Sequence, residues 1–500
     1  MKKLSGFLLL SLLSLAAAAS AEIHLPHVIS DHTVLQRNAP IHIWGWSDPD
    51  EEVTVRFHSQ TRSAAANAQG EWSLWLMPEQ AGGPYTLTAQ GNMGGAAVTV
   101  SDVLVGDVWV ASGQSNMEMP LRGFPGSAVL KNGEQEIRNA TLPQVRLLRI
   151  ERRSSNVPVE DVEGTWTLCT PQTAADFSAV AYFFGREINQ KEHVPIGLID
   201  TTWGGTPVAS WISLDGISAD ASLMPIFAAR TRFADEQSNA ARVIAAEKRA
   251  DAAAAAAHQP APKHRWHPDE SSWRPAGLFN GMIAPITPYS IKGAIWYQGE
   301  SDSDPATAPI YARSFSAMIG DWRSHWQQGD FPFLFVQISS YRSDGEHWGV
   351  VRDQQRRTLA VKNTAMAVSL DVGTPDNVHP PDKQTVGARL ALAARGLVYG
   401  ESVDYSGPLF RQATREESGM RVWFDHDAGL TSKGGALTGF EIAGSDKQFV
   451  PATAAIQGHS VLVTNDAVKN PQYVRYAWQN VTDANLYNGA GLPASTFTSE

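Results

Sequence analysis

Hydrophobic and polar residues alternate in short runs over residues 22–102, and Gly, Pro, Asn and Asp separate these runs. A period of two is typical of strands that bury one face, and turn residues between the runs are typical of antiparallel hairpins. The pattern therefore predicts a small N-terminal β-sandwich. Its expected strands are residues 42–46, 52–57, 72–75 and 85–89.

From residue 103 to residue 400, runs of consecutive apolar residues alternate with longer segments of helical periodicity. The apolar runs cover residues 103–111, 145–150, 194–200, 292–297, 331–339 and 365–371. The helical segments cover residues 177–193, 310–328, 350–362 and 382–399. This alternation predicts an α/β domain with a doubly wound parallel sheet, whose functional site lies at the carboxyl ends of the strands.

Short strand-like runs return after residue 400, at residues 420–424, 461–464 and 473–478. They are bounded by turn residues, as in the N-terminal segment, and no long helical segment separates them. The pattern predicts a C-terminal β region over residues 401–500.

Residues 227–270 interrupt the α/β pattern with Ala-rich, charged sequence. We expect an inserted surface helix and a loop, and the alternative is a lid over the site. The insertion also contains His258, His264 and His267. These histidines have no neighbouring cysteine and form no helical His-x-x-x-His pair, so we expect no metal site among them.

The first 21 residues have the pattern of a signal peptide. Lys2 and Lys3 precede an apolar run over residues 8–15, and small residues at 19–21 form a cleavage site. We therefore expect export to the periplasm or the medium. No later apolar run reaches the roughly 18 residues that span a bilayer. Cys169 is the only cysteine, which excludes an intramolecular disulfide.

The composition limits the class of protein. Hydrophobic residues make up 43% of the sequence, with 16 Trp, 18 Phe and 11 Tyr, which excludes a disordered chain. The 51 acidic residues outnumber the 40 basic ones and give a net charge of −11. This surplus argues against nucleic acid and anionic membranes as partners.

A serine follows the first apolar run of the α/β segment. The run over residues 103–111 ends at Ser112-Gly113-Gln114-Ser115, where glycine permits a tight turn. Ser115 is therefore a candidate nucleophile, and the alternative is a strand-to-helix turn capped by Ser or Asn. The G-x-S-x-G elbow of other hydrolases is not matched, because Met117 occupies the position of its second glycine.

Three further segments that follow apolar runs carry complementary chemistry. Residues 203–206 offer glycine backbone donors, residues 296–300 offer the amide of Gln298, and residues 376–379 offer a carboxylate and an imidazole. A serine nucleophile needs an imidazole base, a group that orients the base, and fixed donors for the oxyanion. The four segments together predict a hydrolase.

The stretches GQSNM, WGGT, WYQGES and DNVHP occur in this order, and the chain closes on YAW, NLYN and GLPAS. In these motifs the sequence resembles the SGNH-hydrolase superfamily, in the form of the sialate O-acetylesterases and related carbohydrate acetylesterases. The resemblance implies a flavodoxin-like, three-layer parallel sheet over residues 103–400. It also implies that Ser115 is the nucleophile and His379 the base. The implied oxyanion donors are the Ser115 backbone, Gly204 or Gly205, and the Gln298 side chain.

The acid that orients His379 is less clear from the motif. Many relatives read Asp-x-His-Pro, whereas here Asn377 holds the aspartate position and Asp376 stands one residue earlier. We expect Asp376 to be the acid, and the alternatives are Asp371 or a backbone carbonyl. Glu300 either holds Gln298 or a nearby loop, or is simply a buried carboxylate.

The expected function is that of an exported esterase, without metal or cofactor, that removes O-acetyl groups from carbohydrates through an acetyl-serine intermediate. Trp203 and Trp296 are the aromatic residues that we expect to contact sugar, since the other rings near the motifs suit a core. The charge surplus favours a neutral polysaccharide of the plant cell wall, such as xyloglucan or xylan. Arg122 is the candidate partner for a sialate carboxylate, or else a surface residue paired with an acid.

Three alternatives to this function stay open. The first is a sialate 9-O-acetylesterase proper, and the second is a carbohydrate-binding protein whose α/β domain is inert. The third is a peptidase or a lipase, although no extended apolar loop lies near Ser115. The sequence does not predict the oligomeric state.

Overall fold

Strand β7 (Val98–Gly113) belongs to two regions of the chain in the computed structural model, which describes residues 22–125, 129–262, 264, 270–417 and 419–500. Its first part pairs with the N-terminal strands β1 (Val34–Gln36) and β6 (Gly82–Gly91). Its second part pairs in parallel with β10 (Ile196–Thr202) and β11 (Gly293–Tyr297). The boundary predicted between residues 102 and 103 therefore lies inside one continuous strand.

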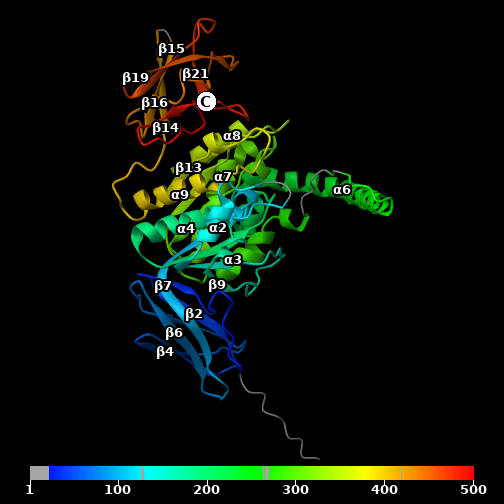
Figure 1. The fold of residues 1–500 in the computed structure, drawn as a ribbon, viewed down its shortest axis with the longest axis vertical. Coiled ribbons are helices and arrows are strands. Elements are labelled where there is room, and N and C mark those ends of the chain that lie inside the picture. The colour runs from blue at the N-terminus through cyan, green and yellow to red at the C-terminus, as the bar shows by residue number, and fades with distance from the viewer. Residues whose placement is uncertain (1–21, 126–128, 263, 265–269, 418) are drawn as a thin grey trace, which may run out of the picture.

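The N-terminal region lies at one end of the molecule, drawn in blue in Figure 1, and its strands pair in antiparallel fashion except that β1 is parallel to β7. The remaining strands of this region are β2 (Ile41–Trp46), β3 (Glu52–Phe57), β4 (Gln60–Ala65) and β5 (Glu71–Leu76). Strand β2 pairs with β5, and β3 pairs with both β4 and β6. Buried positions alternate along β2, β3 and β5, as the sequence pattern predicts. All four predicted strands are present.

The central sheet has the order β13-β12-β11-β7-β10-β8-β9. Its remaining strands are β8 (Leu142–Arg149), β9 (Trp166–Cys169), β12 (Phe333–Gln337) and β13 (Thr364–Val368). All the pairs are parallel except that of β8 with β9. The parallel α/β sheet is thus confirmed, and the antiparallel edge strand β9 is an addition that the sequence pattern did not predict. The strand order reverses around β7, which places the site where β10, β7 and β11 end.

Helices pack against both faces of this sheet. They are α4 (Ala179–Glu192), α7 (Tyr311–Trp326), α8 (Trp348–Arg357) and α9 (Lys383–Leu397). Trp109 of β7 packs against Phe184 of α4, with ring centroids 5.0 Å apart. Trp296 of β11 packs instead against Phe315 and Trp322 of α7. Trp109 is paired with Gly293, so these two residues lie on the same face of the sheet. Trp296 is an odd number of positions after Gly293 along β11, and its side chain therefore points to the opposite face.

Among the described residues of the C-terminal region, drawn in orange and red in Figure 1, the strands form two four-stranded antiparallel sheets and one two-stranded sheet. The first sheet contains β14 (Leu409–Glu416), β15 (Gly419–Asp425), β20 (Ser460–Thr464) and β19 (Thr453–Gln457). The second contains β18 (Val450–Pro451), β17 (Phe440–Ala443), β21 (Tyr473–Tyr476) and β23 (Phe497–Thr498). The third pairs β16 (Thr431–Ser432) with β22 (Leu486–Tyr487). The ring of Phe497 contacts Phe410 and Phe424 of the first sheet, so the two larger sheets share an aromatic core.

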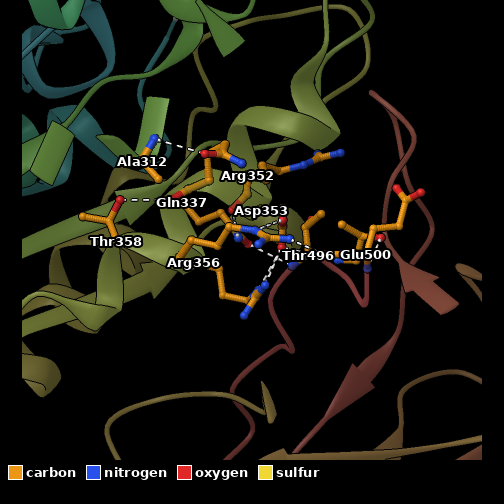
Figure 2. Close-up of polar contacts among 11 residues, drawn as sticks. Ala312, Gln337, Arg352, Asp353, Arg356, Thr358, Thr496 and Glu500 are labelled. Carbon is orange, nitrogen blue, oxygen red and sulfur yellow. Dashed lines mark hydrogen bonds and ion pairs between the residues drawn. The ribbon is translucent and has the colours of Figure 1, made fainter. Parts of the chain in front are cut away.

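Polar contacts fix the C-terminal region to helix α8 (Figure 2). The carboxylate of Asp353 pairs with Arg356 and Arg357 at 2.7 and 2.6 Å. It also accepts a hydrogen bond of 3.3 Å from the backbone of Thr498. Gln337 at the end of β12 accepts from the Thr496 backbone and donates to a carbonyl of α8. The last strand of the chain is thereby held against the central sheet.

The predicted insertion contains a long helix, α6 (Met224–Ala256), which projects from the α/β region in Figure 1. The expected signal peptide at residues 1–21, and His267 in the expected loop, lie outside the described residues. The His264 ring lies 2.7 Å from the Asp251 carboxylate. Within the described residues, no helix is long and apolar enough to span a membrane, and no three His, Cys, Asp or Glu side chains are grouped as metal ligands.

Candidate active site

Ser115 begins a single helical turn, α1 (Ser115–Glu118), immediately after β7. Gly113 at the end of the strand has a φ of +130°, and a Cβ there would lie 2.3 Å from the carbonyl oxygen of Tyr297. Glycine is therefore required for the chain to turn this close to β11. Ser115 is partly exposed, and neither its N–H nor its hydroxyl has a hydrogen-bond partner among the described residues. Both groups are available to a substrate.

Two glycines after β10 lie beside the nucleophile. A Cβ on Gly204 would approach the Cβ of Ser115 to 3.2 Å, so the two backbones are in contact. The N–H of Gly204 donates to Oε2 of Glu118 at 2.5 Å, which leaves it unable to bind an oxyanion. The N–H of Gly205, at a φ of +74°, has no partner in the described part of the chain. Of the two predicted donors, the structure leaves Gly205 free.

The side chain of Gln298 does not match its predicted role as an oxyanion donor. Its amide nitrogen donates to Asp302 Oδ2 at 2.6 Å and to the Thr206 carbonyl at 3.1 Å. Its amide oxygen accepts from the Tyr311 hydroxyl at 2.8 Å. Both amide hydrogens are therefore used inside the protein, and Gln298 is fully buried. This corrects the expectation, because the amide joins the loops after β10 and β11 and does not face the substrate.

Gln114, which the sequence reasoning did not consider, has a free amide nitrogen. Its side-chain oxygen accepts weakly from the backbones of Gly299 and Ser301, at 3.4 and 3.2 Å. The amide nitrogen has no hydrogen-bond partner among the residues described here. Because Gln114 directly precedes Ser115, its side chain lies at the same edge of the sheet as the nucleophile.

His379 lies in the loop between β13 and α9, with its ring partly buried against Phe124. The ring centroids are 5.1 Å apart. Burial, together with the nearby positive charge of Lys383, lowers the pKa of His379 to about 4. The ring is thus neutral near pH 7, as a general base must be.

Neither candidate acid contacts this histidine. Asp376 forms an ion pair of 2.7 Å with Arg342, and its side chain is 80% exposed. Asp371 instead forms two hydrogen bonds with Arg389, at 2.6 and 2.7 Å. The expectation that Asp376 orients His379 is therefore corrected: the attraction of Arg342 turns the carboxylate toward solvent. No side chain or carbonyl within the described residues forms a hydrogen bond with the His379 ring.

A buried asparagine connects the two motifs instead. Asn116 donates from Nδ2 to the Val378 carbonyl at 2.9 Å, and so links the residue after Ser115 to the residue before His379. It also donates to Oε1 of Glu300 at 2.6 Å and accepts from the Nζ of Lys383. These contacts bring the nucleophile turn and the histidine loop side by side. Glu300 thus helps to hold a nearby loop, which is one of the roles that we expected for it.

The residues predicted to contact the substrate differ in their exposure and in their partners. Trp296 is fully buried in the core between β11 and α7, which corrects the expectation that it contacts sugar. Trp203 is partly exposed, and the guanidinium carbon of Arg152 lies 5.9 Å from the centroid of its ring. Arg122 is exposed and paired with Asp176. A surface ion pair is the second of the two roles expected of Arg122, and its role as partner of a sialate carboxylate stays a prediction.

Arg152 is an exposed cation near the nucleophile, which the sequence reasoning did not consider. It forms an ion pair with Glu118, the same carboxylate that holds Gly204. The sequence did not indicate this position, because Arg152 lies far from Ser115 along the chain. It follows β8, and the order of the strands in the sheet brings it to the site. Its position at the carboxyl end of a parallel strand was the available signal.

The doubly wound sheet, with a serine turn and a histidine loop joined at its carboxyl edge, is typical of hydrolases with an α/β fold. The chain is 30% identical to the sialate O-acetylesterase of Rattus norvegicus, over 98% of this chain and 97% of that protein. It is 31% identical to the human sialate O-acetylesterase over 76% of this chain and 72% of that protein. It therefore belongs to the sialate O-acetylesterase family and is a carbohydrate esterase, which confirms the resemblance noted in the sequence.

A family model and a solved structure agree with this membership. The model described as carbohydrate esterase, sialic acid-specific acetylesterase, matches residues 263–395. The crystal structure of a carbohydrate acetylesterase from Xanthomonas citri superposes with a TM-score of 0.82. That protein is 36% identical in sequence, and the match covers 96% of this chain and all of the other. The similarity thus extends to both terminal β regions.

Proposed function

We propose that this esterase removes O-acetyl groups from carbohydrate through an acetyl-serine intermediate, with Ser115 as nucleophile and His379 as general base. The observation that carries this proposal is the link through Asn116, which holds the histidine loop against the turn of the nucleophile. The unpartnered Ser115 hydroxyl and the lowered pKa of His379 support it. Such a pair needs no metal to activate the hydroxyl.

The proposed reaction has two halves. Ser115 Oγ attacks the acetyl carbon while His379 takes the hydroxyl proton, and His379 then returns that proton to the sugar oxygen as the C–O bond breaks. Water next attacks the acetyl-enzyme, again giving its proton to His379, and acetate leaves with Ser115 restored. The oxyanion accepts hydrogen bonds from the free backbone N–H groups of Ser115 and Gly205. The free amide nitrogen of Gln114 is the third donor, in place of the engaged Gln298.

The variants Ser115→Ala and His379→Ala test this assignment. Each should lower the turnover of an aryl acetate by several orders of magnitude, since nucleophile and base act as one unit. Thermal unfolding of each variant should match the wild type, which shows that the fold is kept. Near-wild-type turnover in either folded variant would disprove the mechanism.

For the substrate we propose a neutral acetylated polysaccharide, such as xyloglucan or xylan. The two arginines considered as partners of a substrate carboxylate are already neutralised, because Arg152 pairs with Glu118 and Arg122 with Asp176. A sialate carboxylate would have to compete with these acids. The names of the curated relatives support sialic acid as the second candidate. Acetate release from acetylated xyloglucan, xylan and 9-O-acetylated sialic acid decides between the two.

We also propose that the enzyme is exported, because residues 1–21 have the basic, apolar and small-residue segments of a signal peptide. Expression of the full chain in a bacterium, followed by fractionation and determination of the N-terminal residue, tests this. A mature chain that begins at Glu22 in the periplasm is the expected result, and an uncleaved cytoplasmic chain would contradict it.

A further inference from the structure

A lysine and a glutamate are buried behind the proposed catalytic pair. Lys383, at the start of α9, is fully buried, and so is Asn116, while Glu300 after β11 is nearly so. A buried charge is costly unless another charge or a set of hydrogen bonds compensates for it. Here Asn116 lies between the two charges and hydrogen-bonds to both of them.

The hydrogen-bonding capacity of Asn116 is divided in a specific way. One N–H goes to Glu300 and the other to the Val378 carbonyl, while its oxygen accepts from Lys383. The charged partners therefore fix which way the amide points: the lysine requires the oxygen and the carboxylate requires the nitrogen. An amide turned by 180° would lose both contacts. The bond to Val378, and with it the position of the His379 backbone, thus depends on Lys383 and Glu300.

The surroundings of Lys383 show that its charge also acts on the base. The ionisable groups that face it are Glu300 after β11, Tyr297 at the end of β11 and His379 in the loop before α9. Its Nζ lies 5.3 Å from the centroid of the Tyr297 ring. Burial lowers the pKa of Lys383 to about 7 and raises that of Glu300, and the positive charge of Lys383 helps to lower the pKa of His379.

We propose that Lys383 is a positioning residue, which orients the Asn116 amide so that it holds the backbone of His379 against the nucleophile turn. The link takes over a task that a triad carboxylate performs through the imidazole ring, since no carboxylate contacts the His379 ring in the described structure. This inference rests on the proposed roles of Ser115 and His379.

The primary test compares Lys383→Met with the control Lys131→Met. Lys131 is exposed and pairs with Asp382 at 3.0 Å, so its loss removes the same charge beside α9 without touching Asn116. Lys383→Met should lower kcat for an aryl acetate by about 10²-fold, because misplacement of a catalytic group by about 1 Å costs that much. KM should stay within about twofold, since the positioning acts on the reacting groups and not on substrate binding.

The pH profile separates positioning from simple loss of packing. Removal of the Lys383 charge should move the acid limb of kcat/KM to higher pH, because the pKa of His379 is no longer lowered by that charge. Lys131→Met should leave both the limb and kcat unchanged. An unchanged kcat and an unchanged limb in folded Lys383→Met would overturn the proposal.

A double-mutant cycle with Asn116→Ala tests the route of the effect. If Lys383 acts through Asn116, the variant that carries both changes should have the kcat of Asn116→Ala alone. Losses that multiply would overturn the proposal. If Lys383→Met does not fold, Asn116→Ala decides alone, and an unchanged kcat in that variant would equally refute it. The variant Ser115→Ala distinguishes failure of the proposed mechanism from failure of the positioning role. Full activity of Ser115→Ala would refute the mechanism. If Ser115→Ala is inactive and Lys383→Met is fully active, only the positioning role of Lys383 is refuted.

Discussion

The carboxylate of Asp376 lies 2.7 Å from Nη1 of Arg342, and this ion pair turns it away from His379, three residues further along the chain. A triad acid must instead reach the Nδ1 of the imidazole to fix its tautomer. The exposed ion pair between Asp376 and Arg342 therefore belongs to the surface of the loop. His379 is held in position by the burial of its ring and by the contact of its neighbouring backbone with Asn116.

The variant Asp376→Asn should keep kcat for an aryl acetate within about threefold of the wild type. The reason is that Asp376 contacts Arg342 and not the base, and exposed ion pairs contribute little to stability. Steady-state kinetics on the purified variant provide the measurement, with Asp371→Asn as the matched control. A loss of 10³-fold or more in Asp376→Asn alone would show that the carboxylate turns to the imidazole during the reaction.

The pH dependence should reflect a base with an unusually low pKa. Only the neutral imidazole can take the serine proton, and burial with the charge of Lys383 lowers the pKa of His379 to about 4. Neutral imidazole is then lost as the pH falls through about 4, so the acid limb of kcat/KM should lie well below pH 6. Initial rates across pH, with circular dichroism at each pH, check this. A limb centred near 6.5 would show that a carboxylate partner raises the pKa in the working enzyme.

The sequence predicted the α/β region well because buried parallel strands leave a strong signal. Each of the six apolar runs overlaps a strand of the central sheet. The pattern missed β9 (Trp166–Cys169), since four residues are too few to show a period. It also placed a boundary at residue 103, because it could not show that one strand would pair with N-terminal neighbours first and with central ones later.

Side-chain direction explains the site residues that the sequence misassigned. Motif position placed Ser115, Gly205 and His379 at the carboxyl edge of the sheet, because each follows a strand, and their catalytic roles stay predictions. It could not show that Gln298 would be bound by Asp302, or that Arg342 would attract Asp376 from 34 residues away. Such partners come from other loops, and only the packed fold brings them together.

The variants Gln298→Ala and Gln114→Ala should separate stability from catalysis. Loss of the Gln298 amide leaves the buried Asp302 carboxylate and Tyr311 hydroxyl short of partners, so the free energy of unfolding should fall by about 2–4 kcal/mol. Its kcat should stay within about tenfold of the wild type. Gln114→Ala, which loses a free donor, should lower kcat by roughly 10²–10³-fold. Chemical unfolding and kinetics on both variants test this, and the reverse pattern would return the oxyanion role to Gln298.

Substrate preference should follow the charges around Trp203. Wild-type kcat/KM should be higher for acetylated xyloglucan or xylan than for 9-O-acetylated sialic acid, since Arg152 and Arg122 are already paired with acids. Arg122→Ala should change neither rate, because its guanidinium lies in an exposed pair with Asp176. Acetate release from each substrate by the wild type and by Arg122→Ala and Arg152→Ala provides the comparison.

The arginine variants also identify the binding group if the preference proves to be for the sialate. A carboxylate bound by Arg152 would have to displace Glu118, so Arg152→Ala would lower kcat/KM for the sialate and spare the neutral polysaccharides. The same selective loss in Arg122→Ala would restore that residue as the sialate partner. Equal losses on every substrate in Arg152→Ala would instead indicate that Arg152 acts through Glu118, whose carboxylate holds the Gly204 backbone beside the nucleophile.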